Sequence, residues 1–233
     1  WLVVLQLTIV RFAWNFDPLF RFNSNSIISI IGLCMITLAG IIYLPTRTIL
    51  IIGLAMVGGH NLLDNISFED GTPADIAWSF LHVQKSFDLG NGYSFGFYYP
   101  IIPWIGVMAL GYCLGHLYDA KYSVEKRKKL LFLIGNLSLI LFAGLRYFNL
   151  YGDPVPWNIQ PETATTLISF FNLQKYPPSL LYLSATLGIV FMLLAVMEGE
   201  NLSRWKSVIL FGKVALFYYV LHLFLIHLLA MAA

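Results

Sequence analysis

Residues 176–197 read YPPSLLYLSATLGIVFMLLAVM and contain no Asp, Glu, Lys or Arg. A helix needs about 20 mostly apolar residues to cross a bilayer, and lipid offers the backbone groups of such a segment no partner outside the helix. Similar uncharged runs cover 22–46, 89–118 and 214–233, and shorter ones cover 48–63 and 130–145. With the apolar start of the chain, they predict about seven membrane-spanning helices, near 1–15, 26–44, 48–66, 97–118, 130–148, 178–197 and 208–231.

The composition supports the same class. Of the 233 residues, 58% are hydrophobic and 11% are charged, and the mean hydropathy is +0.74. Soluble domains average about 45–50% apolar and about 25% charged residues, so a disordered chain, a disulfide scaffold and an ordinary cytosolic domain are excluded. A transmembrane barrel would show alternating segments of about ten residues, which are missing from the sequence. We therefore expect an all-α, polytopic transmembrane helix bundle that forms a single domain over 1–233.

The net charge, the cysteines and the first residue say less about the class of protein. The net charge of +2 gives no reason to expect a nucleic-acid partner. Cys34 and Cys113 lie in apolar runs and are expected to pack as small hydrophobic residues. The chain begins with Trp1 inside an apolar segment, which favours an N-terminally truncated sequence with further residues upstream.

The basic residues predict the orientation. Five of the nine residues from Lys121 to Lys129 are basic, so the positive-inside rule places the loop near 119–129 in the cytoplasm. Alternation puts Arg47, Arg204, Lys206 and Lys213 on the same side. The same loop could also bind lipid headgroups or a partner. The stretches 67–96 and 149–177 then become outer loops, which we expect to be non-helical.

Ionisable residues within the spans are costly in lipid and default to functional hypotheses. His60 and Asp64 are four residues apart in the third predicted helix, so they share a helical face. A carboxylate beside an imidazole fixes its tautomer and raises its basicity, as a general base requires. The alternative is a buried pair that joins helices, with Asn61 bonding between them.

The last predicted helix carries His222 and His227, which are five residues apart and do not share a face. Arg11 and Arg146 either extend to lipid headgroups or face inward to hold a carboxylate, a phosphate or a developing oxyanion. Lys175 lies beside a Tyr-Pro-Pro turn and is expected at the interface.

His82 and His116 have no suitable partner nearby in the sequence, so little function is expected of them. Gly111-x-x-x-Gly115 is a weak helix-packing motif. No metal is expected, because no ligand cluster has a suitable spacing. Walker, nucleophile-elbow and dinucleotide motifs are also missing. The residues alone thus suit a membrane enzyme with a general base, or a proton-coupled transporter.

Five runs carry a resemblance to a known family: GHNLLD at 59–64, IPWIGVMALGY at 102–112, YGDPVPW at 151–157, KYPPSLL at 175–181 and FGKVALFYYVLH at 211–222. The chain resembles the bacterial membrane family related to the catalytic domain of heparan-alpha-glucosaminide N-acetyltransferase, within the transmembrane acyltransferases. This resemblance implies transfer of an acyl group, typically acetyl from acetyl-CoA, to a sugar or other acceptor across the membrane. It also implies further helices before Trp1, including the histidine usually assigned to catalysis, which no residue here matches. His60 and Asp64 would then support catalysis or bind substrate.

The working hypothesis assigns catalysis to His60, Asp64 and His222. It assigns substrate binding to the set Asn61, Arg11, Arg146, Lys175 and His227. The expected partners are the lipid bilayer, a sugar or glycoconjugate acceptor and a second copy of the chain, in a bacterial cytoplasmic membrane. The competing classes are a proton-coupled transporter or flippase, whose usual inverted repeat is not visible, and a non-catalytic structural membrane subunit.

Overall fold

The computed structural model describes residues 1–199 and 205–232. Its contacts divide the chain into two compact units. The first contains 1–33, 85–99 and the described part of 200–233, and the second contains 34–84 and 100–199. Each unit is described by itself, and the predicted Arg204 lies outside the described residues.

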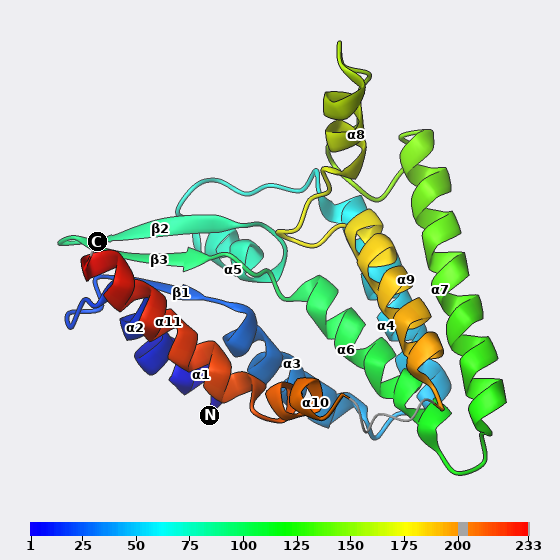
Figure 1. The fold of residues 1–233 in the computed structure, drawn as a ribbon. Coiled ribbons are helices and arrows are strands. Elements are labelled where there is room, and N and C mark those ends of the chain that lie inside the picture. Colours follow the sequence, from blue (N-terminus) through cyan, green and yellow to red (C-terminus); the bar gives the residue numbers. More distant parts are fainter. Residues whose placement is uncertain (200–204, 233) are drawn as a thin grey trace. The chain divides into compact units, whose positions relative to one another are not determined.

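The second unit is built on two helix pairs. Helix α4 (Thr46–Gly59) packs against α6 (Ile102–Gly115), and α7 (Val124–Tyr147) packs along α9 (Leu180–Met197) (Figure 1). Glycines set both crossings. A Cβ on Gly53 would lie 3.1 Å from the Gly106 carbonyl oxygen, and a Cβ on Gly135 would lie 3.0 Å from that of Gly188. Small residues let helix backbones approach closely where lipid provides no hydrophobic driving force.

The Gly111-x-x-x-Gly115 motif does not serve this purpose. No atom of the described chain lies within 4 Å of a Cβ built on either glycine, leaving aside their own helix and chain neighbours. The spacing was therefore a poor guide to the contact, and Gly106 on the same helix makes it instead.

Both stretches expected to be non-helical contain helices, so that expectation is wrong. Helix α5 (Pro73–Leu81) starts with a proline whose missing N–H costs nothing at this position, and the Thr72 hydroxyl accepts a hydrogen bond from the Asp75 amide at 3.2 Å. Helix α8 (Thr163–Phe171) lies in the other stretch. The basic segment 119–129 is likewise partly helical, because Ser123 caps α7 and the helix begins at Val124.

Short elements connect the pairs. The 3-10 turns η2 (His60–Leu63) and η3 (His116–Tyr118) continue α4 and α6. Helix α9 begins at Leu180, two residues later than predicted, with Ser179 as its cap. Helix α3 (Ile27–Ile41) runs from the first unit into the second.

The first unit combines helices with a small sheet that was not predicted. Helix α1 (Leu2–Leu5), the π-helical turn η1 (Gln6–Val10) and α2 (Arg11–Asn15) follow one another, and α10 (Lys206–Lys213) precedes α11 (Ala215–Ala232). Helix α11 packs on η1 and α2 around Val10, Ala13 and Leu223. In the sheet, β3 (Tyr93–Phe97) lies between β1 (Phe22–Asn25), to which it is parallel, and β2 (Lys85–Gly90), to which it is antiparallel.

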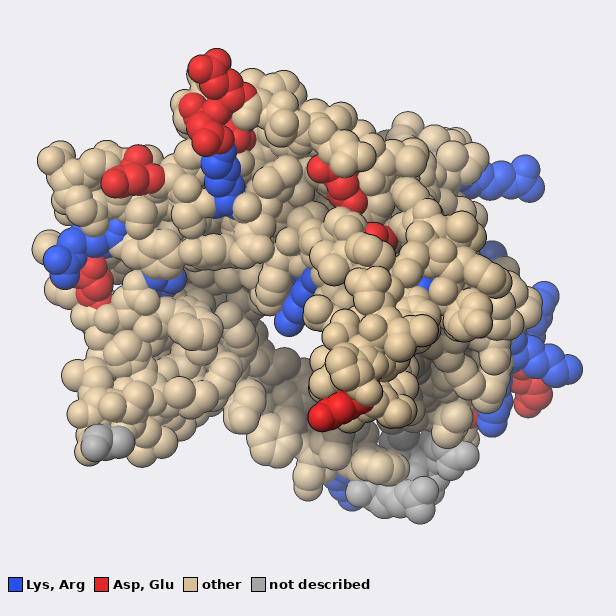
Figure 2. Space-filling view, turned by 90° about the horizontal axis from the view of Figure 1, so that it is seen from above, with Lys and Arg blue, Asp and Glu red and all other residues tan. Residues whose placement is uncertain are grey.

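Helices occur in all seven predicted ranges, so the mainly helical fold is confirmed. Within residues 1–199 and 205–232, four helices are long and apolar enough to cross a membrane: Thr46–Leu63, Val124–Tyr147, Leu180–Met197 and Ala215–Ala232. The helical segments Leu2–Asn15, Ile27–Ile41 and Ile102–Tyr118 are shorter, so seven spans are not confirmed. Uncharged side chains cover most of the face seen in Figure 2, with charged groups scattered among them.

Candidate functional site

The candidate site forms where α4 ends. The chain leaves the α-helical path at Gly59 and continues as the 3-10 turn η2. In a 3-10 helix, residues three apart are aligned, so His60 and Asp64, four apart, are not stacked as on an α-helix, although their ligand atoms lie within 4.8 Å of each other. Instead, the Asp64 Oδ1 atom lies 2.9 Å from Nε2 of His82, the residue that follows α5. The expected pairing of Asp64 with His60 is therefore replaced by a pairing with His82.

Asn61 holds the other side of the Asp64 carboxylate. Its Nδ2 donates to Asp64 Oδ2 at 2.9 Å, while its Oδ1 accepts from the Leu180 amide at 2.9 Å. Burial opposes ionisation of Asp64, but the hydrogen bonds from His82 and Asn61 outweigh it and keep the pKa of this carboxyl below its ordinary value. Asp64 is therefore a carboxylate at neutral pH, and Asn61 connects it to the first turn of α9.

The two histidines are buried and incompletely bonded. Each is 1% exposed, and their ring centroids lie 5.7 Å apart with the planes at 65°. Neither ring nitrogen of His60, nor Nδ1 of His82, makes a hydrogen bond within the described structure. One ligand atom from each of His60, Asp64 and His82 lies within 4.8 Å of the others. These three side chains are called the His–Asp–His group below.

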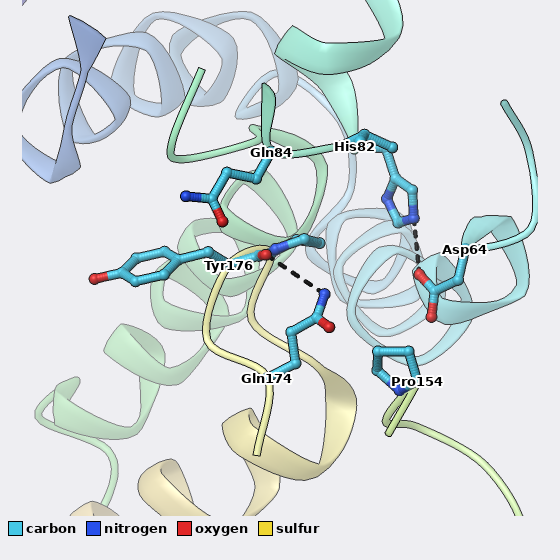
Figure 3. A pocket seen from close by; sticks show the side chains of 8 residues that line it. Asp64, His82, Gln84, Pro154, Gln174 and Tyr176 are labelled. Atoms are coloured by element: carbon cyan, nitrogen blue, oxygen red, sulfur yellow. Dashed lines mark hydrogen bonds and ion pairs between the residues drawn. The ribbon is translucent and has the colours of Figure 1, made fainter. Parts of the chain in front are cut away.

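A pocket of about 360 Å³ opens beside this group. Figure 3 shows Asp64 and His82 on one side of it and Gln174 and Tyr176, from the loop before α9, on the other. The lining residues are Asp64, His82, Val83, Gln84, Pro154, Gln174, Tyr176 and Pro177. Gln174 Nε2 donates to the Tyr176 carbonyl oxygen at 3.4 Å, a hydrogen bond within this loop. The pocket therefore combines an imidazole–carboxylate pair with amide groups, a combination that suits a polar ligand.

The loop after α7 is fixed to the end of α4. The Tyr151 hydroxyl donates to the Gly58 carbonyl oxygen at 2.7 Å. Burial and the nearby Asp64 charge raise the pKa of Tyr151, so it stays protonated as the hydrogen-bond donor. This bond braces the turn that presents His60 and Asp64.

Arg146 lies within the protein rather than at the lipid headgroups, since it is 1% exposed. Its guanidinium donates to the carbonyl oxygens of Phe170, Val155, Ser169 and Asn172 at 2.7–2.9 Å, and Nη1 lies 3.8 Å from Asp153 Oδ1. The Asp153 carboxylate also accepts from the Ser179 hydroxyl and the Gln174 amide. A substrate anion would have to displace one of these bonds, so the role of Arg146 as a substrate ligand stays a prediction.

Three predicted residues belong to the first unit. Arg11 Nε donates to the Phe22 carbonyl oxygen, and its guanidinium lies 4.2 Å from the Phe22 ring centroid. His222 Nδ1 is 3.0 Å from the Tyr218 carbonyl oxygen, and His227 Nδ1 is 2.9 Å from that of Trp14. In the second unit, Lys175 lies over the Tyr176 ring, with Nζ 5.2 Å from its centroid. The functional roles assigned to these residues stay predictions.

His82 is the site residue that the sequence analysis missed. It lies in a stretch assigned to a loop, and its partner Asp64 is 18 residues away. No helical or strand periodicity links positions that far apart, so no local pattern could have paired them.

Comparison with known proteins identifies a family. No curated protein and no solved structure matches the chain. The family described as "Heparan-alpha-glucosaminide N-acetyltransferase, catalytic" matches residues 2–146, which is well over half of the chain and includes all three members of the His–Asp–His group. Together with the four apolar helices, this match indicates an integral membrane protein. The chain therefore belongs to the heparan-alpha-glucosaminide N-acetyltransferase catalytic family.

Proposed function

We propose that this chain is an integral membrane acyltransferase that moves an acyl group, typically acetyl, from a CoA thioester to a sugar or other extracytoplasmic acceptor. Family membership, which points to membrane acetyltransferases, is the observation that carries the proposal. The pocket beside the His–Asp–His group supports it, because that pocket lies at the end of a helix long enough to cross a membrane.

The chemistry requires a group that accepts a proton. An acceptor hydroxyl or amine attacks the thioester carbonyl more readily as it loses its proton, and the thiolate of CoA leaves. We assign the proton-accepting role to the His–Asp–His group. Asp64 orients the His82 ring through the 2.9 Å contact, while His60 lies buried beside it with unbonded nitrogens. Asn61 keeps the carboxylate in place.

The remaining predicted residues are proposed to bind substrate or to complete catalysis. His222 would act with His60 and Asp64, and the set Arg11, Arg146, Lys175 and His227 would bind anionic or polar parts of the donor and acceptor. We further propose a multi-pass arrangement in a bacterial cytoplasmic membrane with the segment 119–129 in the cytoplasm, because this segment concentrates basic residues.

The test is acetyl transfer in membranes that contain the intact protein. Radiolabelled acetyl-CoA is supplied with glucosamine or with native membrane glycoconjugates, and labelled acceptor is counted. Loss of a proton-accepting group lowers such a rate by about 10²–10⁴-fold, so His82→Asn and His60→Ala should each fall in this range. His222→Ala tests the third assigned residue in the same assay.

His116→Ala is the matched control. His116 faces Asp119 with 3.7 Å between Nδ1 and Oδ2, and this partly exposed pair lies outside the lining of the pocket. Its variant should transfer acetyl at the wild-type rate. Wild-type rates in both the His60 and His82 variants would refute their role, whereas a wild-type protein without transfer would refute the function itself.

A further inference from the structure

We propose that His60, Asp64 and His82 form a binding site for a divalent transition-metal ion, and for Zn²⁺ in particular. Two imidazoles and one carboxylate are a donor set that zinc prefers. The three ligand atoms lie within 4.8 Å of one another although they come from the end of α4 and from the residue after α5. Spacing along the chain gave no reason to expect a metal, because His82 is far from His60 and Asp64 in the sequence. The fold brings the three side chains together.

The distances are close to those of a bound ion. Zinc binds nitrogen and oxygen at about 2.0–2.2 Å, which puts tetrahedral donors roughly 3.3–3.5 Å apart. His82 Nε2 and Asp64 Oδ1 are 2.9 Å apart, already close to this spacing. One ligand nitrogen of His60 lies within 4.8 Å of both atoms, so it has to move closer to them to complete the set.

The unbonded nitrogens provide a second, independent observation. His60 is 1% exposed, and both of its ring nitrogens are buried without a hydrogen bond in the described structure. Nearly all buried polar side-chain atoms in proteins have a partner, so an exception calls for an explanation. A metal ion in the group would bind one of these nitrogens and would also use the imidazole of His82.

The surroundings match a metal site in two further ways. Asn61 already orients the carboxylate through its 2.9 Å hydrogen bond, in the manner of outer partners that hold metal ligands in place. The pocket lies against Asp64 and His82, so a fourth ligand can enter from it. Three protein ligands with one accessible position are typical of zinc sites that bind a further molecule.

Metal content of the purified intact protein tests the proposal directly. The protein is stripped with a chelator, loaded with excess Zn²⁺, desalted and analysed by elemental mass spectrometry. About one zinc per chain is expected. Co²⁺ loading of the wild type should give the visible absorption of a tetrahedral ion, a readout that requires no variant to fold.

The variants define the ligands. The double variant His60→Gln/His82→Gln should retain less than about a tenth of an equivalent, whereas the partly exposed control His116→Gln should retain the wild-type amount. Asn61→Ala should weaken zinc binding about 10–100-fold. Wild-type protein that takes up no Zn²⁺ or Co²⁺ overturns the proposal, and so does a folded double variant that still holds one equivalent.

One consequence depends on the proposed function. A nitrogen that binds zinc has no lone pair left for a proton, so zinc in the site should slow acetyl transfer, and chelation should restore it. Zinc that binds stoichiometrically without slowing transfer would refute the proton-accepting role of the group but leave the metal site standing. Absence of acetyl transfer altogether would refute the function without affecting the metal measurement.

Discussion

Two buried polar groups in the second unit differ in how completely they are bonded. Arg146 donates four hydrogen bonds to carbonyl oxygens, and its Nη1 lies 3.8 Å from Asp153 Oδ1. His60 is equally buried, at 1% exposed, yet neither ring nitrogen makes a hydrogen bond in the described structure. Burying either side chain has a free-energy cost, because its polar atoms lose their contacts with water. Only Arg146 offsets this cost with hydrogen bonds inside the protein.

This difference distinguishes buried residues that stabilise the fold from buried residues that can take part in binding or catalysis. A fully bonded buried group stabilises the fold and can bind a ligand only if it gives up one of its contacts. A partly bonded group contributes little to stability and keeps donors or acceptors for a substrate, a proton or a metal ion. Residue type gives no such distinction, since both residues are ionisable groups in predicted spans.

The largest effect is expected at Arg146. Arg146→Met keeps much of the side-chain volume but leaves the carbonyl oxygens and Asp153 without their donor, and loss of one partner of a buried ion pair costs about 3–5 kcal/mol. Unfolding in detergent, followed by circular dichroism during denaturant titration, should show this loss. The exposed Arg47 provides the control Arg47→Met, which should be close to wild type. A small change in the unfolding free energy of Arg146→Met would mean that the contacts of Arg146 with the carbonyl oxygens and Asp153 contribute little stability.

Asn61 connects the His–Asp–His group to the fold around it, because it bonds both the Asp64 carboxylate and the start of α9. Asn61→Ala removes a hydrogen bond to a charged group and a helix-end contact, so stability should fall by about 2–3 kcal/mol. Acetyl transfer should also fall, because Asp64 loses one of the two contacts that orient its carboxylate, the other being to His82. Asn136 bonds only the Phe132 carbonyl of its own helix, and Asn136→Ala is the matched control. Equal losses in the two variants would contradict the connecting role of Asn61.

The helices were predictable because hydropathy is a local property. An uncharged run such as 176–197 indicates a helix whatever it packs against, and α9 occupies most of that run. The sheet was not predictable in this way. Strand β1 pairs with β3 across about 70 residues, and only the Gly90-Asn91-Gly92 turn between β2 and β3, where all three residues have positive φ, left a local signal.

The site was predictable only in part, for a geometric reason. The GHNLLD run identified His60, Asn61 and Asp64 as the polar end of a helix, and these residues do cluster. Their relative directions were wrong because the chain tightens to 3-10 geometry at His60, which rotates Asp64 away from the α-helical face. Spacing along one element could not reveal that Asp64 would contact His82, the residue that follows α5.

Tyr151 offers a smaller change. Tyr151→Phe removes the hydroxyl that donates to the Gly58 carbonyl oxygen and little else. One hydrogen bond contributes about 1 kcal/mol, so the unfolding free energy should fall by that amount, and acetyl transfer should fall modestly as the turn loosens. Tyr147 is 63% exposed, so Tyr147→Phe should change neither quantity. A Tyr151→Phe variant as stable and active as wild type would mean that the turn is fixed without this bond.

The smallest change in stability is expected at His60, and it tests the comparison most sharply. His60→Met replaces a buried imidazole that has no hydrogen bonds with an apolar side chain of similar volume, so no hydrogen bond is lost and the unfolding free energy should change by less than about 1 kcal/mol. Measured in chelator-treated protein, where no metal adds to wild-type stability, unfolding should therefore stay close to wild type. Acetyl transfer should nevertheless fall about 10²-fold or more, and added Zn²⁺ should stabilise the wild type but not the variant. A variant that unfolds as readily as Arg146→Met would show that His60 supports the fold and would contradict the comparison.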